Sequence, residues 1–87
     1  MRKRAEWMTR SDDEILEYLN CYGSGTPVMI ANETGLHNNY VTAKARKLEE
    51  YGLVERPSRG FYTLTETGEK YLEGDLDADD LEPRGNQ

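Results

Sequence analysis

The sequence is poor in cysteine, histidine and long apolar runs, and each shortage excludes a class of protein. A single cysteine, Cys21, cannot form an internal disulfide, and with one histidine it leaves too few ligands for a zinc site. No stretch approaches the roughly 18 apolar residues of a membrane span, and the basic residues 2–4 are not followed by the apolar segment of a signal peptide. We therefore expect a cytoplasmic protein without a membrane or metal partner, in which Cys21 is a small buried thiol.

Signatures of catalysis are also missing. No serine or cysteine stands beside a base, no glycine-rich loop is arranged to hold phosphate, and no set of metal ligands recurs. The sequence predicts neither an enzyme nor a cofactor-binding protein.

The chain has 87 residues, of which 36% are hydrophobic and 32% charged, with a mean hydropathy of -0.91. At this length surface outweighs interior, so we expect one small domain with a sparing core.

The net charge of -6 argues against a nucleic-acid partner until its distribution is considered. Residues 73–87 carry six carboxylates and one arginine, a net charge of -5, whereas residues 1–72 are nearly neutral at -1. The cations of the body are clustered at Arg2, Lys3, Arg4 and Arg10, at Lys44, Arg46 and Lys47, and at Arg56 and Arg59. An anionic partner is therefore compatible with this acidic chain.

Two helices are predicted before residue 36. Residues 11–14 read as a capping box opened by Ser11, followed by a buried stripe. Thr26 and Pro27 begin a second, short helix that Gly35 ends. The inward residues we expect are Ile15, Leu16, Leu19 and Tyr22 on the first helix, and Val28, Ile30 and Ala31 on the second.

The stretch 38–51 is predicted to be a longer amphipathic helix that Gly52 ends. Val41, Ala45 and Leu48 recur on one side, as in a helix of about 3.6 residues per turn. The opposite face carries amide, hydroxyl, methyl and cationic groups, which read base edges and bind phosphates in DNA. These residues are Asn38, Asn39, Thr42, Ala43, Arg46 and Lys47. A short helix, a glycine turn and a longer basic helix indicate a helix-turn-helix, although a solvated face without function has a similar composition.

A hairpin and a last helix are predicted after residue 52. Residues 53–57 and 61–65 are rich in strand-forming residues and are joined by 58–60. Thr65 then caps a helix at 66–73 that turns Tyr71 and Leu72 inward, and Gly68 permits close packing within it.

Three segments are expected along the chain. Residues 1–6 form a basic arm, read as a frayed terminus, and residues 7–74 form the domain. Residues 75–87 form an acidic tail with one short helix at 77–82, in which Leu76 packs on Leu81, and with no order beyond Pro83.

The motifs Thr34-Gly35-Leu36-His37, Leu48 to Val54, 59–62 and 64–68 resemble those of winged helix-turn-helix DNA-binding domains. The chain is most similar to small repressor-like proteins of halophilic archaea and their viruses, over residues 7 to 82, and its acidity fits such a source. The resemblance implies an α+β fold with a three-helix core, a two-stranded hairpin wing and a short C-terminal helix. It implies a recognition helix at 38–51 and a wing tip at 58–60, with His37 where the family often carries a serine or threonine cap.

The function we expect is sequence-specific regulation of transcription, as a repressor that binds double-stranded DNA and blocks or recruits transcription machinery. A homodimer is expected, because one such domain reads few base pairs. Base edges are assigned to Asn38, Asn39, Thr42, Ala43 and Arg46, phosphates to Lys44, Lys47 and Arg56, and the wing tip to Ser58 and Arg59, with Arg59 in the minor groove. The dimer interface is assigned to Trp7, Met8, Phe61, Leu76 and Leu81.

Two alternatives concern the acidity. A winged-helix module that binds protein and not DNA also fits a negatively charged chain. The six carboxylates of residues 73–87 are also suited to fold over Lys44, Arg46 and Lys47 and compete with phosphate, although a tail that only aids solubility is the simpler interpretation.

Overall fold

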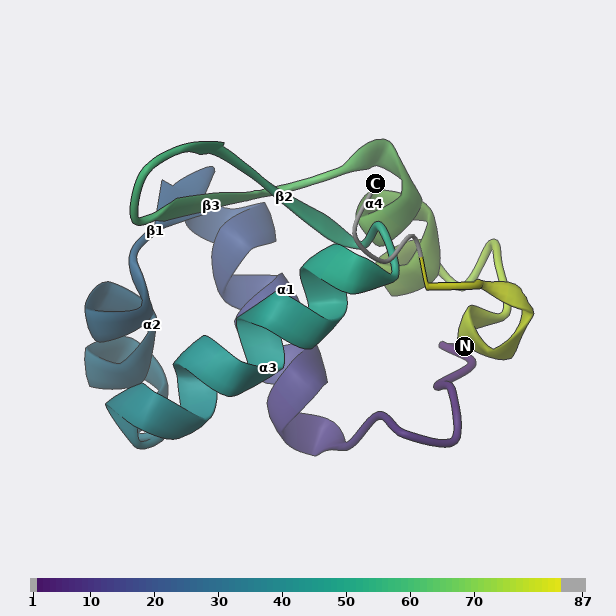
Figure 1. The fold of residues 1–87 in the computed structure, drawn as a ribbon. Helices are drawn as coiled ribbons and strands as arrows, with labels where there is room; N and C mark the ends of the chain where they lie inside the picture. The colour runs from purple at the N-terminus through teal and green to yellow at the C-terminus, as the bar shows by residue number, and fades with distance from the viewer. Residues whose placement is uncertain (1, 84–87) are drawn as a thin grey trace.

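The protein, here a computed structural model that describes residues 2–83, has four α-helices and a small antiparallel sheet (Figure 1). The sheet order is β1-β3-β2, and α3 lies across α1 in the view of Figure 1. The α+β winged-helix architecture expected from the sequence is confirmed. The elements are α1 (Arg10–Tyr22), β1 (Ser24–Gly25), α2 (Pro27–Thr34), α3 (Asn38–Glu50), β2 (Val54–Ser58), β3 (Phe61–Leu64), α4 (Glu66–Glu73) and a 3₁₀ turn, η1 (Ala78–Asp80).

The core forms where α1 and α3 cross. It consists of apolar side chains that are almost completely removed from water, and burial of such side chains is the main favourable term in folding. The predicted stripes of both helices are confirmed: Ile15, Leu16 and Leu19 on α1, and Val41, Ala45 and Leu48 on α3.

Two residues predicted to be inward are exposed. Tyr22 is the last residue of α1 and packs its ring on Tyr18, with centroids 4.6 Å apart, instead of entering the core. Val28 stands in the first turn of α2 and is 52% exposed, whereas Ile30 and Ala31 further along are buried. A short helix buries only a narrow stripe of side chains, so the spacing of apolar residues predicted more buried residues than the structure has.

The first helix begins earlier than predicted, because Thr9 is its cap and not Ser11. Asp12 is the third helical residue, and its Oδ2 accepts a hydrogen bond from the Thr9 backbone N–H at 2.8 Å. This carboxylate satisfies an amide that the helix itself leaves free.

Strand β1 was not predicted. Ser24 pairs with Thr63 and Gly25 with Tyr62, so the segment after α1 extends the hairpin into a three-stranded sheet. Gly25 permits β1 to lie close to α1 while it pairs with β3, because a Cβ there would lie 2.6 Å from Cε1 of Tyr18. The sequence signals only the end of a helix at this point, since two residues are too few to show a strand pattern.

The basic arm is packed and not frayed. Arg2 pairs with Glu17 and donates from Nε to the Leu72 carbonyl at 3.0 Å. Arg4 Nε lies 3.0 Å from Asp13 Oδ2. Residues of the arm thereby join α1 to α4, and Met1 lies outside the described residues.

A buried tyrosine completes this junction. The Tyr71 hydroxyl donates to Asp13 Oδ1 at 2.6 Å, and burial raises the pKa of Tyr71, which keeps the hydroxyl protonated as a donor. Both oxygens of Asp13 thus have a partner, one from the arm and one from α4.

The acidic tail packs on the arm as far as Leu81. The backbone N–H of Ala78 donates to the Lys3 carbonyl at 2.9 Å, and Ala78 is buried. The N–H of Glu6 donates to Asp79 Oδ1, also at 2.9 Å. Residues 84–87, for which no order was expected, lie outside the described residues. None of the helices in residues 2–83 has the length and apolar character needed to cross a membrane.

Replacement of Gly68 by alanine should destabilise the fold. A Cβ at this position would lie 2.3 Å from the Leu53 carbonyl oxygen and 2.5 Å from Leu64 Cδ1, so α4 must move off the sheet. We expect a loss of about 1–3 kcal/mol, because overpacking outweighs the gain in helix propensity. Urea denaturation measures it, with the exposed Glu69→Ala in the same helix as control; equal midpoints for both variants would contradict the close packing.

Candidate nucleic-acid interface

Helix α3 is presented by a turn that its neighbours hold firmly. Thr26 caps α2 by accepting from the Met29 N–H at 3.1 Å, and Gly35 ends it in the left-handed region at φ 80°. The Thr34 hydroxyl donates to the Ile30 carbonyl and accepts from the Leu36 N–H. His37 then stands at the cap of α3 in extended conformation without a side-chain hydrogen bond. Backbone and threonine contacts therefore set the turn, and the histidine contributes its carbonyl, which accepts from the Val41 N–H at 2.9 Å, but no hydrogen bond from its side chain.

The outer face of α3 is free for a ligand. Asn38, Asn39, Ala43 and Arg46 are exposed, and Thr42 is half-buried with its hydroxyl donating to the Asn38 carbonyl at 3.1 Å. Arg46 takes part in none of the ion pairs found within residues 2–83. The structure brings these five predicted base-reading residues together on one side of a helix whose other side is buried.

Lys47 lies at one edge of this face, beside an aromatic pair. Its Nζ is 5.3 Å from the centroid of the Trp7 ring, and Trp7 packs on Tyr51 with centroids 4.7 Å apart. A cation over the face of a tryptophan is attracted to the ring. The exposed ammonium is thereby held at the C-terminal half of α3, where a phosphate contact was predicted.

The position of Lys44 is at odds with the phosphate contact predicted for it. Its Nζ lies 2.9 Å from Oδ2 of the buried Asp12, and its side chain is only 17% exposed. The Tyr40 ring covers the ammonium from another side, 5.6 Å away. Lys44 was predicted to be an outer cation because the sequence does not show that Asp12 is buried on α1 beside it.

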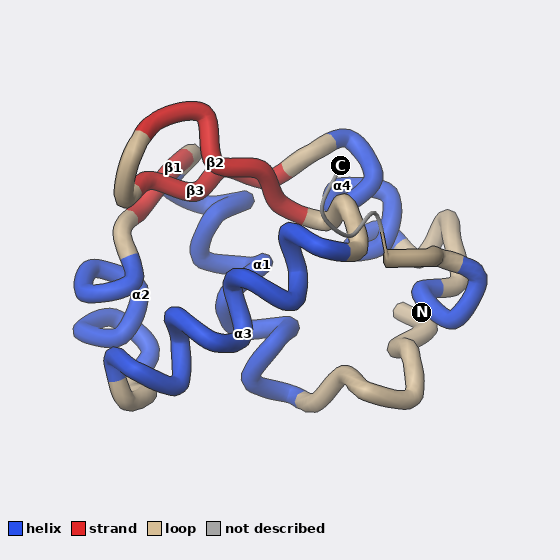
Figure 2. The backbone as a smooth tube through the Cα atoms, viewed as in Figure 1, coloured by secondary structure: helices blue, strands red, loops and turns tan. Residues whose placement is uncertain are grey.

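The hairpin of β2 and β3 supplies the second predicted part of the interface (Figure 2). Arg56, Ser58 and Arg59 are all exposed, and Gly60 makes the tip at φ 82°. The pairing is irregular between Glu55 and Ser58, the segment that includes Pro57. The predicted phosphate contact Arg56 and the predicted wing-tip residues Ser58 and Arg59 thus lie on the exposed hairpin, separate in sequence from α3.

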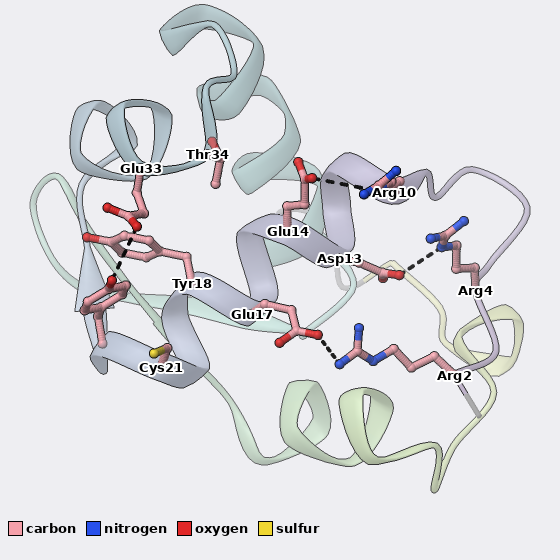
Figure 3. Close-up of a pocket in the computed structure, with 11 residues that line it drawn as sticks. Arg2, Arg4, Arg10, Asp13, Glu14, Glu17, Tyr18, Cys21, Glu33 and Thr34 are labelled. Carbon is pink, nitrogen blue, oxygen red and sulfur yellow. Dashed lines mark hydrogen bonds and ion pairs between the residues drawn. The ribbon is translucent and has the colours of Figure 1, made fainter.

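A wide cleft of about 660 Å³ lies along α1, lined in part by the arm (Figure 3). Three arginines there each meet a carboxylate of α1: Arg2 with Glu17, Arg4 with Asp13, and Arg10 with Glu14. Arg2 and Arg4 are thereby largely neutralised within the protein, whereas Arg10 is 86% exposed and meets Glu14 only at 3.8 Å. Cys21 also lines this cleft and is exposed, which corrects the expectation of a buried thiol.

The apolar residues assigned to a dimer interface are mostly used inside the monomer. Met8 is buried in the core, and Trp7, Leu76 and Leu81 are half-buried against it. Only Phe61 of the five is exposed, at 42%. Among residues 2–83 the large exposed apolar residues are Tyr22, Val28, Met29, Tyr40 and Phe61, of which only Phe61 had been predicted to lie in an interface.

Within residues 75–83, the tail packs on the arm and makes no ion pair with the outer cations of α3, Arg46 and Lys47. Its contacts with the arm are made through Ala78 and Asp79. Competition between the tail and phosphate therefore has no support in this arrangement.

Three helices, a short second helix turning into an exposed third, and a hairpin beyond it define a winged helix-turn-helix protein. The chain matches the family of winged helix-turn-helix phage repressors over residues 1–84. It is 35% identical over 92 residues to the repressor protein of Halobacterium phage phiH, covering 94% of this chain and 98% of that relative. The chain therefore belongs to the winged helix-turn-helix phage repressor family, whose members are DNA-binding regulators of transcription and not enzymes.

Solved structures agree with this family. The crystal structure of the PhiH1 repressor-like protein from Haloarcula marismortui superposes with a TM-score of 0.88 at 33% identity, over 95% of this chain and 97% of that one. Reduced MarR from E. coli superposes with a TM-score of 0.73 at 23% identity, over 80% of this chain and 52% of that one. The likeness to MarR concerns the fold alone.

Trp7 should report binding at this face. It is the only tryptophan of the chain and lies beside Lys47, so a phosphate that draws the ammonium off the ring changes its surroundings. We expect its fluorescence to change when duplex DNA is added, and Lys47→Met to lose most of that change. An emission spectrum that duplex DNA leaves unaltered in the parent, while anisotropy shows binding, would place the ligand elsewhere.

Proposed function

We propose that this protein represses transcription by binding specific double-stranded DNA, with α3 in the major groove and the hairpin at the flanking backbone and minor groove. The observation that carries the proposal is the division of α3 into two sides. Val41, Ala45 and Leu48 are buried to within 1% of completely, whereas Asn39, Ala43 and Arg46 on the other side are exposed. A rigid helix that presents amide, methyl and guanidinium groups fits the chemistry of base edges.

Each group on this face suits a particular part of DNA. Arg46 matches the two acceptors of guanine, and Asn38 or Asn39 matches the donor and acceptor of adenine. Thr42 and Ala43 suit the methyl group of thymine. On the hairpin, Arg59 suits the negative potential of a narrow minor groove, while Arg56 and Ser58 reach phosphate.

Phosphate attraction supplies only a modest share of this binding. Four cations lie on the proposed interface within residues 2–83, namely Arg46, Lys47, Arg56 and Arg59. Arg2, Arg4 and Lys44 are paired with carboxylates, and Arg10 meets Glu14 only loosely, at 3.8 Å. Since few counterions are released, base contacts must account for much of the affinity.

This balance suits concentrated salt. The chain has a pI near 4.7, and the two relatives named above come from a Halobacterium phage and from Haloarcula marismortui. We include in the proposal a halophilic archaeal setting, where phosphate attraction is weak and specific contacts still discriminate between sequences.

We further propose that the protein acts as a homodimer on a two-fold symmetric site, and that it represses by blocking the transcription machinery. One α3 reads only a few base pairs, and two copies double the number of contacts. Selection of bound fragments from a random duplex library tests this together with sequence specificity. A palindromic consensus supports a dimer, whereas recovery of no consensus, with no anisotropy change at micromolar protein in low salt, would favour a module that binds protein.

Replacement of Arg46 by alanine should weaken binding to the selected site by about 1–3 kcal/mol and relax the preference at one base pair. A matched control is Arg10→Ala, because Arg10 lies on α1 with its side chain 86% exposed and only a loose pair to Glu14 at 3.8 Å. Gel shifts against the consensus and its point variants measure both effects. Arg46 has no such role if both variants bind alike.

The dependence on salt should be shallow for a DNA-binding protein. With four cations at the interface, log K should fall against log salt with a slope no steeper than about -3.6 per protomer. Arg59→Ala should reduce the steepness by about 1, since it removes one phosphate or groove contact. Anisotropy titrations over a series of KCl concentrations give the slope, and a markedly steeper one would mean that the arm arginines leave their carboxylates to join the interface.

A further inference from the structure

Asp12 is a fully buried carboxylate in the first turn of α1, and α3 supplies its counter-charge. Its Oδ2 accepts from the Thr9 N–H at 2.8 Å and from Lys44 Nζ at 2.9 Å. Its Oδ1 has no hydrogen-bond partner within residues 2–83. The pair connects residues 32 positions apart, from the start of one helix to the middle of the other.

Stability alone is a poor explanation for this pair. Removing two charges from water costs more than a single imperfectly satisfied contact returns, and apolar replacements of buried ion pairs are often neutral or stabilising. The unpartnered Oδ1 adds a further cost, because a buried acceptor without a donor loses its hydration. What such a pair does provide is one defined geometry, since any displacement separates the charges in a medium of low dielectric.

The rotation of helix α3 about its axis has to be fixed in this way if its outer side chains are to read base edges. Two of the three residues in its buried stripe, Val41 and Ala45, are small, and apolar contacts are not directional, so the ion pair adds a directional constraint that the stripe does not supply. Lys44 lies beside this stripe, and Arg46 lies two residues further, about 200° around the helix. At a radius of about 5–6 Å, a rotation of about 10° moves the outer side chains by about 1 Å. That is enough to spoil a bidentate contact with a base.

We infer that the Asp12–Lys44 ion pair fixes the rotation of α3 about its own axis, which makes Lys44 a positioning residue for the reading of base edges. This inference rests on the proposed function. It gives the buried charges a purpose that neither phosphate binding nor core packing explains, and it predicts that their loss affects selectivity more than overall affinity.

The test is the full-length double variant Asp12→Asn, Lys44→Met, which removes both charges and keeps an oxygen for the Thr9 N–H. Binding is measured by anisotropy on the duplex selected by the parent protein and on a scrambled duplex of the same composition. We expect a melting temperature within about 8 °C of the parent and affinity for the scrambled duplex within about twofold. The ratio of the two affinities should fall about tenfold or more, the loss of roughly one base contact, and renewed selection should return a broadened consensus.

Lys47→Met is the matched control, because Lys47 is exposed at the edge of the same helix. It should weaken both duplexes alike, lower the salt slope by about 1 and leave their ratio unchanged. The same result for the double variant would make Lys44 a phosphate contact and overturn the inference. An unchanged ratio with an unchanged consensus would overturn it as well.

The inference can still be tested if the double variant does not fold. The single variant Asp12→Asn retains an acceptor for both Thr9 and Lys44 and removes the ionic attraction. If this single variant folds and keeps the selectivity of the parent, the pair does not position α3. Absence of any selected consensus for the parent protein is a separate result, which overturns the proposed function itself and not only the role of Lys44.

Discussion

The small size of the core constrains the rest of this structure. A chain of 87 residues buries little apolar surface, so every segment that packs is needed. Ala5 and Met8 of the N-terminal region and Ala78 of the acidic tail all belong to the buried cluster. Both ends of the domain are therefore recruited to cover α1 and α4, and α3 is left as the one long helix with an unoccupied side.

Charged side chains are also used within the monomer. Arg2 and Arg4 lie against carboxylates of α1, and Lys44 lies against Asp12, so part of the basic clusters of the sequence is neutralised within the protein. Neutral amides together with a few cations remain on the outer face of α3 and on the hairpin. A repressor built this way depends on the fit of its side chains to base edges more than on attraction to the phosphate backbone.

The sequence predicted the elements that local rules determine. The helix stripes of α1 and α3, the Thr26–Pro27 start of α2 and the hairpin all follow from periodicity and capping. Contacts between residues distant in sequence could not be predicted in this way. Strand β1 forms only because β3 lies beside it, and Lys44 turns inward only because Asp12 is buried. Surface residues of α3 were identifiable from spacing, whereas a helical wheel places Lys44 at a boundary that tertiary contacts decide.

The contact between Lys3 and Ala78 has a consequence for cooperativity. The Lys3 carbonyl accepts from the Ala78 N–H at 2.9 Å, so segments on either side of the four helices are joined directly. Separation of these two segments exposes the buried Ala78 and removes the cover of the helices from both sides. The domain is therefore expected to unfold as one unit and not piece by piece.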